Sequence, residues 1–462
     1  MYSTLLQSQS SVNVKALWQS EPFIVGNMPN QNLTRWEVLQ AAEQLSQHNL
    51  GLSNSTPLSA TVLFQQRHHF LISCLAVALK KGHTILPPNL AQNTLSQLNK
   101  AQCNLWVFDD ETPQGLKEQN QVQSRQIDYI IDQVKSQPLD FDEQDLESLF
   151  SSIKDSEIWL YTSGTTGAPK KIIKTWQNLI HSAQIAINRF QLMQPNYIVA
   201  TVPNQHMFGL ETAIFWPLFS QSSLWFERPL FPEDIRDALQ ANSNFPALLV
   251  STPLHLNKLQ AFDLKWPTHL TRVLSATAPL SKSLAEQVEK QMDVQVFEIY
   301  GSTETASIAS KQTTVSDQWF CYQNVELQPQ HNQNYAVKTP GLNQFELLND
   351  QIELIDPRHF KLGKRNSDLI KIAGKRASLA ELNHRLQSIE GLTEGVFIPS
   401  KTSERLIAFV VSDLSSPDII KALRKSIDPV FLPRPIIFLK TLPRNEVGKV
   451  LYNELQSNLT HE

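Results

Sequence analysis

The most informative stretch of the sequence is Tyr161-Thr-Ser-Gly-Thr-Thr-Gly-Ala-Pro-Lys170, which directly follows Glu157-Ile-Trp-Leu. The short apolar run before it, bounded by turn residues, predicts a buried strand. After this strand, hydroxyl side chains alternate with glycines and lead to a lysine. Glycines let the backbone approach an anion closely, while N–H groups, hydroxyls and a lysine charge all interact with phosphate oxygens. The stretch therefore predicts a strand followed by a phosphate-binding loop.

Two other phosphate-binding patterns do not match this stretch. The Walker loop ends in Gly-Lys-Ser/Thr, whereas Ala168 and Pro169 separate the last glycine from Lys170. The dinucleotide fingerprint spaces its glycines differently and opens a helix directly. A loop rich in Ser, Thr and Gly also occurs as a simple flexible connection. Motifs elsewhere in the chain must therefore decide between these interpretations.

The composition indicates a globular protein. The chain has 462 residues, of which 41% are hydrophobic and 18% charged, with a net charge of −4. These values do not favour a disordered chain or a nucleic-acid binder. Three cysteines, Cys74, Cys103 and Cys321, stand far apart without metal or disulfide spacing, which suits a reducing cytosol. The N-terminus lacks signal-peptide features, and the apolar stretch 70–79 is too short to span a bilayer. We therefore expect a soluble, cytoplasmic protein without a membrane span.

Strand and helix patterns alternate along most of the chain. Thr34 and Glu37 form a predicted capping box for a helix over 34–49, and a second helix is expected over 70–79. Strands are predicted near 60–64, 84–86, 198–202, 247–251, 272–275 and 294–299, and 318–355 is strand-like. Apolar residues at helical spacing predict a helix containing Leu179, Ala183, Ala186 and Phe190. The polar, weakly periodic segment 110–156 is expected to be a surface connection with some helix.

The character of the sequence changes after about residue 365. A capping box at Ser378-Leu-Ala-Glu381, an apolar stripe and three further strand patterns predict a small α+β unit. The stripe consists of Leu382, Leu386 and Ile389, and Gly391 is the predicted helix stop. Residues 361–462 hold 16 Lys and Arg against 11 Asp and Glu, a net charge of +5. The predicted fold class is α/β: a large domain (1–364) of parallel and mixed sheets covered by helices, and a small α+β domain (365–462).

A second motif is Glu298-Ile-Tyr-Gly-Ser-Thr-Glu304, at the end of a predicted strand. A tyrosine can stack on a purine, and a glycine permits the close approach of a ligand. A carboxylate beside bound phosphates is a natural Mg²⁺ ligand. Taken alone, Glu304 is equally well explained as a residue at a helix start, where the helix dipole stabilises negative charge.

The two motifs together resemble those of the adenylate-forming superfamily: acyl-CoA synthetases, aryl-CoA ligases, nonribosomal adenylation domains and firefly luciferase. The resemblance implies binding of ATP and Mg²⁺, with the metal held by Glu304. It implies catalytic roles for Thr303 and Lys170, and a mobile C-terminal lid. It also implies that ATP or AMP contacts Thr162, Ser163, Gly164, Thr165, Thr166, Gly167, Tyr300, Gly301 and Ser302.

Two intervening segments extend the resemblance. Val202-Pro-Asn-Gln-His-Met-Phe-Gly-Leu210 resembles the segment that gates the family's acyl pocket, which implies a catalytic role for His206 and pocket positions at Phe208 and Gly209. Ser275-Ala-Thr-Ala-Pro279 occupies the place of the adenine-pocket turn, with Ala276 and Thr277 replacing the usual glycines. The resemblance assigns the nucleotide to Ser275, Ala276 and Thr277, and the acyl pocket to Ala278.

The C-terminal motifs follow in the family's order. Either Asp350 or Asp356 can supply the ribose-binding carboxylate, and Asp350 is preferred because the gap to the nucleotide-binding Arg365 fits the family layout. The string Arg365-Asn-Ser-Asp-Leu-Ile-Lys-Ile-Ala-Gly374 resembles the hinge, with Asp368 at the pivot and Lys371 and Gly374 in the thioester tunnel. Leu442-Pro-Arg-Asn-Glu-Val-Gly-Lys449 resembles the loop that carries the catalytic lysine.

The resemblance implies attack of a carboxylate on the α-phosphorus of ATP, followed by transfer of the acyl group to a thiol. The pocket segments 208–212, 275–278 and 301–303 favour an aryl or medium acyl acid over an amino acid. The chain is similar to stand-alone ligases of bacterial aryl-polyene clusters, so the acceptor is CoA or the phosphopantetheine of an acidic acyl carrier protein. Two alternatives stay open: a luciferase-like oxidase, and a nucleotide-binding regulatory protein without turnover, for which the missing Thr-Gly before Asp350 is the support.

Overall fold

The computed structural model describes residues 14–27, 31–47, 58–88, 103–108, 121–137, 139–140, 142–162, 170–330, 334–365, 369–372, 375–400, 405–445, 448 and 450–457. The chain folds into two units, each with its own core. The N-terminal unit comprises Met1–Glu326 and Lys338–Glu346, and the C-terminal unit comprises Leu327–Val337 and Leu347–Glu462. These bounds differ from the predicted boundary at 364/365. That boundary separates the large domain from the mobile C-terminal lid, and it stays a prediction.

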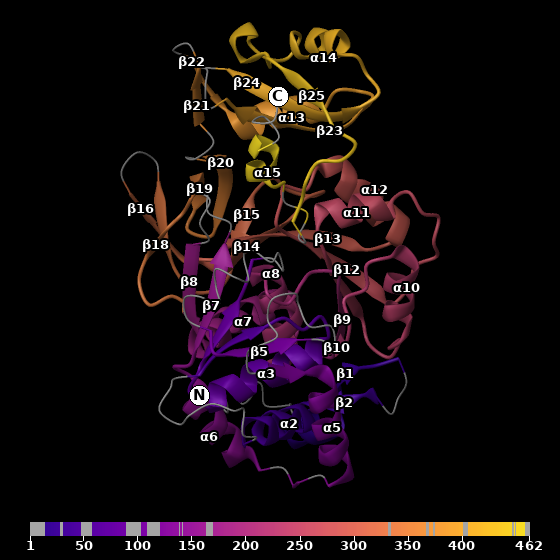
Figure 1. Ribbon diagram of the computed structural model, residues 1–462, viewed down its shortest axis with the longest axis vertical. Helices are drawn as coiled ribbons and strands as arrows, with labels where there is room; N and C mark the ends of the chain where they lie inside the picture. The colour runs from indigo at the N-terminus through magenta and orange to yellow at the C-terminus, as the bar shows by residue number, and fades with distance from the viewer. Residues whose placement is uncertain are drawn as a thin grey trace. The chain divides into compact units, whose positions relative to one another are not determined.

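The phosphate-loop region belongs to a six-stranded sheet of the N-terminal unit (Figure 1), in the order β6-β5-β3-β4-β7-β8. Neighbours are parallel except for β7 and β8, which are antiparallel. The predicted strands near 60–64 and 84–86, and the one before the loop, are confirmed. The bounds are β3 Ser59–Val62, β4 His83–Leu86, β5 Leu105–Phe108, β6 Gln121–Gln123, β7 Glu157–Thr162 and β8 Lys170–Thr175.

Helices α2 (Arg35–Gln47) and α3 (Arg67–Leu79) confirm the two predicted N-terminal helices. The capping box at the start of α2 is reciprocal: the Thr34 N–H donates to Glu37 Oε2 at 2.7 Å, and the Glu37 N–H donates to Thr34 Oγ1 at 3.1 Å. Helix α3 packs against β3 and β4, and α2 packs against α3. The capping box therefore fixes the start of α2 at Arg35.

Thr34→Ala is expected to lower the free energy of unfolding by about 1 kcal/mol, because the Glu37 N–H loses its acceptor at the helix start. Urea unfolding of the purified variant measures this change. Thr34→Ser keeps the hydroxyl acceptor and should retain most of the stability. Equal losses for both substitutions would contradict the capping role.

The prediction for residues 110–156 is right in expecting helix but wrong in expecting a surface connection, where the structure describes them. Strand β6 pairs with β5, and two helices, α5 (Ser124–Ser136) and α6 (Glu143–Ile153), contribute to the core. Helix α5 buries a regular stripe at Ile127, Ile130, Ile131 and Val134. The many Gln, Asp and Glu residues occupy the exposed faces of these helices. Because they make the segment polar on average, the buried stripe is not apparent from composition. Residues 109–120 lie outside the described residues.

A second sheet carries the other predicted strands of the N-terminal unit. Within that unit its order is β15-β14-β13-β12-β11-β9-β10-β1-β2, and the strands from β13 to β1 are parallel. The bounds are β1 Pro22–Val25, β2 Leu33–Thr34, β9 Asn196–Ala200, β10 Ser222–Trp225, β11 Ala247–Ser251, β12 Leu270–Ser275, β13 Gln295–Ser302, β14 Ala306–Gln312 and β15 Trp319–Cys321.

Helix α7 (Trp176–Phe190) contacts β8 of the first sheet and β14 of the second, so it joins the two sheets through one core. Its predicted apolar stripe is confirmed, because Leu179, Ala183, Ala186 and Phe190 are all buried. The remaining helices of the N-terminal unit are η1 Ala16–Ser20, α8 Met207–Leu210, η3 Glu211–Phe215, α9 Trp216–Leu218, α10 Pro232–Gln240, α11 Pro253–Leu259 and α12 Lys282–Met292.

The C-terminal unit has the predicted α+β character. Leu382 and Leu386 of helix α13 are buried, and Ile389 packs against the same core just beyond the helix. The chain crosses from one unit to the other within three strands, β16 Glu326–Pro329, β17 Tyr335–Lys338 and β18 Glu346–Leu347. The other elements are β19 Asp350–Asp356, β20 His359–Arg365, β21 Leu369–Ile372, β22 Lys375–Ser378, α13 Leu379–Gln387, β23 Leu392–Pro399, β24 Leu406–Ser412, α14 Ser416–Leu423, η6 Pro429–Phe431, β25 Ile436–Phe438 and α15 Tyr452–Ser457. Across the described residues, every helix is too short or too polar to cross a bilayer.

Candidate active site

The ends of the predicted phosphate loop are adjacent in space. Strands β7 and β8 are antiparallel, and Thr162 at the end of β7 is the register partner of Lys170 at the start of β8. The segment between them, with the predicted contacts Ser163, Gly164, Thr165, Thr166 and Gly167, lies outside the described residues, as does the Thr162 side chain. The described strands therefore hold both ends of this segment at one edge of the sheet.

Lys170 and Glu304 meet, although they come from different sheets and are 134 residues apart in the chain. Lys170 Nζ donates to Glu304 Oε1 at 3.0 Å, with side-chain exposures of 62% and 20%. Burial opposes ionisation of Glu304, but the hydrogen bond from Lys170 and further hydrogen bonds outweigh it and hold the pKa of this carboxyl below its ordinary value. The structure thus brings together the predicted phosphate-binding lysine and an ionised carboxylate.

The turn that carries Glu304 is closed by its own side chains. The Ser302 N–H donates to Thr305 Oγ1 at 3.0 Å, and the Thr305 N–H donates to Ser302 Oγ at 3.1 Å. The predicted catalytic residue Thr303 is half-buried inside this bracket. These reciprocal bonds hold residues 302–305 as one turn between β13 and β14.

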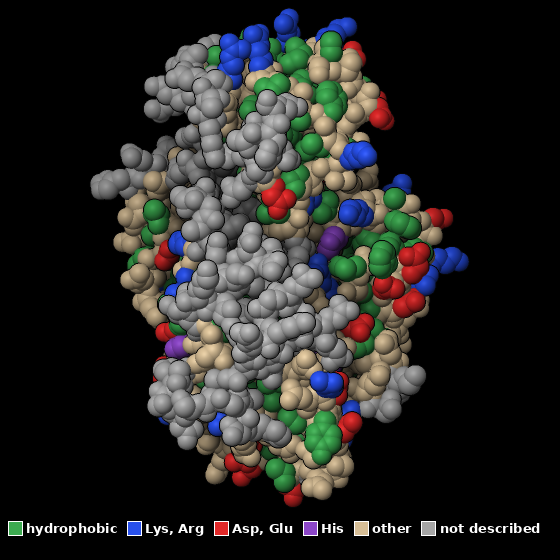
Figure 2. All heavy atoms as spheres, viewed as in Figure 1, with side chains coloured by type: hydrophobic (Ala, Val, Ile, Leu, Met, Phe, Trp, Pro, Cys, Tyr) green, Lys and Arg blue, Asp and Glu red, His purple; other side chains and the backbone are tan. Residues whose placement is uncertain are grey.

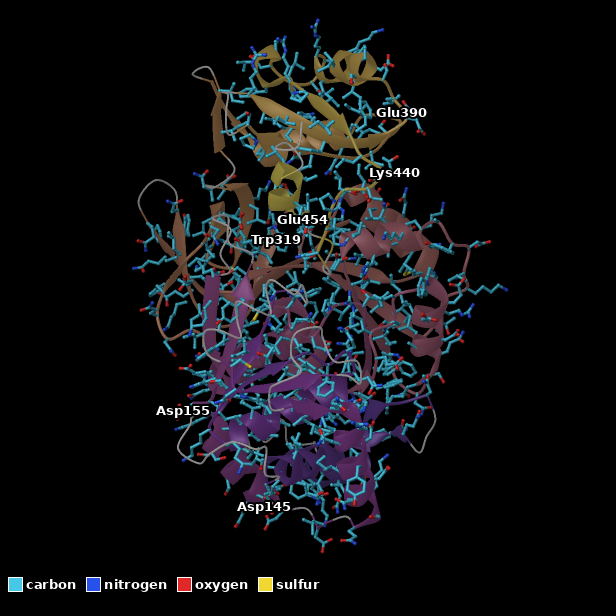
Figure 3. All side chains as sticks on the ribbon, in the orientation of Figure 1. Asp145, Asp155, Trp319, Glu390, Lys440 and Glu454 are labelled. Atoms are coloured by element: carbon cyan, nitrogen blue, oxygen red, sulfur yellow. The ribbon has the colours of Figure 1, made fainter. Side chains whose placement is uncertain are left out.

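Close backbone contact makes Gly301 necessary in this turn. A Cβ atom at this position would lie 2.1 Å from the carbonyl oxygen of Ala306. The β13–β14 register shifts between Tyr300 and Gly301, and Ala306 adopts a left-handed φ of 61°. Tyr300 is half-exposed, with its ring centroid 5.5 Å from that of Trp319, labelled on β15 in Figure 3. The half-exposed ring has a face on which a planar base can stack.

The predicted adenine turn follows β12. Ser275 and Ala276 are buried, while Thr277 and Ala278 are exposed. Thr277 has a left-handed φ of 78°, a conformation that glycine adopts more readily. The turn therefore keeps a backbone shape suited to glycine, although the glycine itself is replaced.

Glu298 anchors the chain just beyond this turn. Its buried carboxylate accepts hydrogen bonds from the Leu280 N–H at 3.0 Å and Thr313 Oγ1 at 3.1 Å. Lys311 Nζ lies 3.1 Å from the Oε2 atom of the same carboxylate. The first residue of the Glu298–Glu304 motif thus fixes the adenine turn to β13 and β14.

The predicted acyl-pocket segment contains a half-buried histidine, His206. Burial, with a smaller effect of the Arg228 charge, lowers the pKa of His206 to about 4. Within the described residues, His206 Nε2 has no hydrogen-bond partner. Phe208 is half-buried, and a Cβ atom at Gly209 would lie 1.9 Å from the carbonyl oxygen of Pro203. Gly209 is therefore required by close packing against this segment.

Arg67 and Asn204 support this segment and were not found from the sequence. The buried Arg67 guanidinium donates to Asn204 Oδ1 and to the carbonyl oxygen of Ala200 at 2.5 Å. Asn204 Nδ2 donates to the carbonyl oxygens of Phe64 and Gln65 at 3.2 and 3.1 Å. A single arginine at the start of a helix carries no sequence signal for this role, because its acceptors are distant groups brought together only by the fold.

Lys174 and Glu211 are buried residues that hydrogen-bond residues 304 and 307 at the β13–β14 turn. Their roles were also not predicted. Lys174 Nζ donates to the main-chain carbonyl oxygen of Glu304. Glu211 accepts from Ser307, with the N–H at 3.1 Å from Oε2 and the Oγ at 2.8 Å from Oε1. The spacing of Lys170 and Lys174 on β8 places both on one face of the strand, and this spacing is the signal that was available.

The pH dependence of stability is expected to report on Glu211. Burial raises the pKa of its carboxyl from the ordinary 4.5 to about 7. Between these values the folded protein holds a proton that the unfolded chain has released, so the free energy of unfolding falls as the pH rises through this window. Glu211→Gln should remove this fall in urea unfolding measured across the window, whereas Glu286→Gln, at an exposed position on α12, should keep it. An unchanged slope in Glu211→Gln would contradict the assignment.

In the C-terminal unit, Asp350 and Arg365 are register partners in the β19–β20 hairpin. The alternative carboxylate, Asp356, closes the turn of the same hairpin by accepting from the N–H groups of Arg358 and His359 at 2.8 and 2.9 Å. These bonds hold Asp356 within its own turn. The Arg365 side chain is not described, so the pairing at the ribose stays a prediction.

In the segment expected to carry the catalytic lysine, Arg444 bonds two described residues. Its Nη1 donates to the carbonyl oxygen of Gly448 at 2.7 Å, and its Nη2 donates to Glu394 Oε2 at 2.9 Å. Gly448 has a left-handed φ of 79°. Lys449, Asp368 and Gly374 lie outside the described residues, as does the side chain of Lys371, so their roles stay predictions.

One further group of metal-ligand atoms occurs among the described residues. His68, His69 and Asp128 bring such atoms within 4.8 Å of one another. However, the centroids of the two imidazole rings are only 4.1 Å apart, and burial, with smaller effects of the His69 and Lys135 charges, lowers the pKa of His68. His69 Nε2 already pairs with Asp128 Oδ1 at 2.7 Å. The arrangement joins α3 to α5 and does not favour a cation.

Comparison with known proteins places this geometry in context. The model of the AMP-binding enzyme family matches residues 16–357. A probable CoA ligase, CCL5 of Humulus lupulus, is 26% identical over 354 residues, which cover 65% of this chain and 63% of that protein. The 2-succinylbenzoate–CoA ligase of Listeria monocytogenes is 22% identical and covers 64% of this chain and 69% of its own length.

A solved structure resembles the whole fold. O-succinylbenzoate coenzyme A synthetase of Bacillus subtilis in complex with AMP superimposes with a TM-score of 0.77 at 18% identity, covering 98% of each chain. The same synthetase has also been solved with ATP and a magnesium ion. These likenesses confirm the predicted α/β fold class.

Proposed function

The chain belongs to the AMP-binding enzyme family, and we propose that it is an ATP-dependent ligase that activates a carboxylic acid as an acyl adenylate and transfers it to a thiol. The observation that carries the proposal is the contact between Lys170 Nζ and Glu304 Oε1 at 3.0 Å. It joins the end of the predicted phosphate loop to the turn that follows β13. A cation and an ionised carboxylate at this junction suit the phosphates of ATP and a hard metal ion, respectively.

The proposed first step is the attack of a carboxylate oxygen on the α-phosphorus of ATP. A bond forms from the acid oxygen to phosphorus, and the bond to the leaving pyrophosphate breaks. Lys170 and the loop hydroxyls hold the terminal phosphates, and Asp350 with Arg365 holds the ribose. Lys449 stabilises the negative charge that develops on the reacting oxygens. Positioning and charge neutralisation account for most of the catalysis in such displacements.

Mg²⁺ fits the residues present at Glu304. The carboxyl remains ionised because its pKa is held below the ordinary value, and its side chain is 20% exposed. Carboxylate oxygens are preferred ligands of this ion. When bound, the ion neutralises charge on the phosphates. Glu304 is the residue of this chain that would hold it.

The proposed acid is an aryl or medium acyl acid. His206 is held neutral by burial, and Phe208 and the exposed Ala278 contribute apolar surface. The one carboxylate in the pocket segment 208–212, Glu211, is buried against Ser307 and is therefore not presented to a substrate ammonium group. An amino acid substrate would need such a partner, since a buried ammonium group is costly without one.

The proposed thiol is that of CoA or of the phosphopantetheine on an acyl carrier protein. Residues 361–462 carry a net charge of +5. On the face shown in Figure 2, Lys and Arg side chains gather over the C-terminal unit, where Lys421, Arg424 and Lys425 are exposed on and just after α14. Positive charge suits the phosphates of CoA and an acidic carrier protein equally. We infer that the 365–462 domain pivots at Asp368 between the two half-reactions.

Pyrophosphate release with ATP and Mg²⁺ tests the proposal. A panel of benzoates, hydroxycinnamates, fatty acids of medium and long chain, and amino acids is assayed alone, then with CoA or a holo carrier protein. Release with an aryl or medium acyl acid, increased by one acceptor, is the expected result. No release with any acid, although ATP binds, would contradict the ligase and favour the regulatory interpretation.

A further inference from the structure

We propose that Lys174 and Glu211 are positioning residues, which hold the main chain of residues 304–307 so that the Glu304 carboxylate is presented to a divalent cation. This inference rests on the proposed function, because it assigns Mg²⁺ to Glu304. It concerns two buried side chains that do not contact the nucleotide in the proposed mechanism.

Lys174 acts on the main chain of the residue whose side chain Lys170 contacts. Lys174 Nζ donates to the carbonyl oxygen of Glu304, while Lys170 Nζ donates to the carboxylate of Glu304. Both lysines lie on the same face of β8, because they are four residues apart on a strand. One strand therefore holds both the backbone and the side chain of Glu304.

Glu211 holds the other end of the same short segment. Its carboxylate accepts from both the N–H and the hydroxyl of Ser307, three residues beyond Glu304. It belongs to η3, the helix that directly follows Leu210. The segment 304–307 is thus fixed at its start from β8 and at its end from η3.

The cost of burying these groups indicates that they do more than fill space. Lys174 is 5% exposed and Glu211 is 3% exposed. Burial lowers the pKa of Lys174, although the charges of Glu211, Glu346 and Glu304 act against this, and burial raises the pKa of Glu211. Replacing two buried charges with apolar residues is often neutral or favourable for stability. Their hydrogen bonds to Glu304 and Ser307 instead fix the main chain that carries the Glu304 carboxylate.

This arrangement predicts a defect confined to the metal. A carboxylate that shifts by a fraction of an ångström loses much of its preference for an ion with strict octahedral geometry. The phosphates and base of ATP are held by other groups in the proposed mechanism. Loss of Lys174 should therefore weaken metal-dependent nucleotide binding and leave metal-free binding unchanged.

Calorimetric titration of ATP, with Mg²⁺ varied and with Mg²⁺ chelated, tests this inference in the full chain. Lys174→Met is expected to raise the Mg²⁺ concentration needed for tight ATP binding by about tenfold, since a hydrogen bond from a charged donor is lost. Lys174→Arg retains a charged donor and should recover part of this loss. Metal-free ATP affinity should be the same in all variants.

Lys171→Met is the matched control. Lys171 is the second residue of β8 and lies on the opposite face of the strand from Lys174. Its Nζ atom lies 3.6 Å from the centroid of the Trp159 ring. It should keep the wild-type Mg²⁺ dependence. Where Lys174→Met does not fold, because Glu211 is left without its countercharge, the double variant Lys174→Met/Glu211→Gln removes both charges and should show the same shift.

The outcomes separate this inference from the function on which it rests. Wild-type Mg²⁺ dependence in a folded Lys174→Met or double variant would overturn the positioning role and leave the ligase proposal intact. An equal loss of metal-free ATP binding would also overturn it, because the defect would then be general. A wild-type protein that binds ATP without any effect of Mg²⁺ would overturn the assignment of the metal and this inference together.

Discussion

Lys449→Ala lowers the rate of acyl-adenylate formation by about two to three orders of magnitude, while ATP affinity is unchanged. A lysine that neutralises charge developing in the transition state contributes to the rate and little to ground-state binding. Gly448, the residue directly before it, is held through its carbonyl oxygen, which accepts from Arg444 at 2.7 Å. Single-turnover measurement of adenylate formation gives the rate, and calorimetry gives the ATP affinity.

Lys440→Ala is the control for this prediction. Lys440 is an exposed lysine of the C-terminal unit, just after β25, and is labelled in Figure 3. Removing it takes the same charge from the same unit without altering the proposed chemistry. Equal rates for Lys449→Ala and the wild type would place the catalytic lysine elsewhere. Equal losses for the two variants would reduce the effect to the net charge of the unit.

Gly301→Ala destabilises the N-terminal unit by about 3 kcal/mol, an effect at the upper end for overpacked sites. The added Cβ atom would meet the carbonyl oxygen of Ala306 at 2.1 Å, and this neighbour is backbone that cannot rotate away. The turn must then open, which moves Tyr300 and Glu304 from their places. Weaker binding of Mg·ATP should accompany the lower stability, and urea unfolding and calorimetry measure the two effects.

Gly363→Ala serves as the comparison for the glycine substitution. Its Cβ atom would lie 3.2 Å from the carbonyl oxygen of Gln351, so a small shift of the exposed hairpin relieves the contact. It should therefore cost much less stability than Gly301→Ala. A folded Gly301→Ala variant with wild-type stability and binding would show that the turn is not required to have this backbone geometry.

The sequence predicted the elements whose signals are local. The strand before the phosphate loop, the capping box of Thr34 and Glu37, and the apolar stripe of α7 all depend on residues close together in the chain. Motif order was enough to expect that Lys170 and Glu304 belong to one site. Their 3.0 Å contact is a tertiary fact that motif order does not contain.

The missed features depend on contacts between distant residues. The stripe of α5 was obscured because polar residues on its exposed faces dominate the composition. Glu211 lies within the predicted pocket segment 208–212, and only the fold shows that its carboxylate accepts a hydrogen bond from Ser307. Arg67 binds backbone carbonyl groups near residue 200, and no residue pattern marks such acceptors. Side-chain roles that use main-chain partners are therefore the least predictable from the sequence.

The path of the acid oxygen tests the central claim most directly. An aryl or medium acyl acid labelled with heavy oxygen in its carboxylate is incubated with the enzyme, ATP, Mg²⁺ and the thiol acceptor, and the nucleotide product is analysed by mass spectrometry. The acid oxygen that attacks the α-phosphorus must remain on AMP when the thiol displaces it, so AMP carrying one label is the predicted result. Unlabelled AMP, or ADP with labelled phosphate, would contradict activation of the acid as an acyl adenylate.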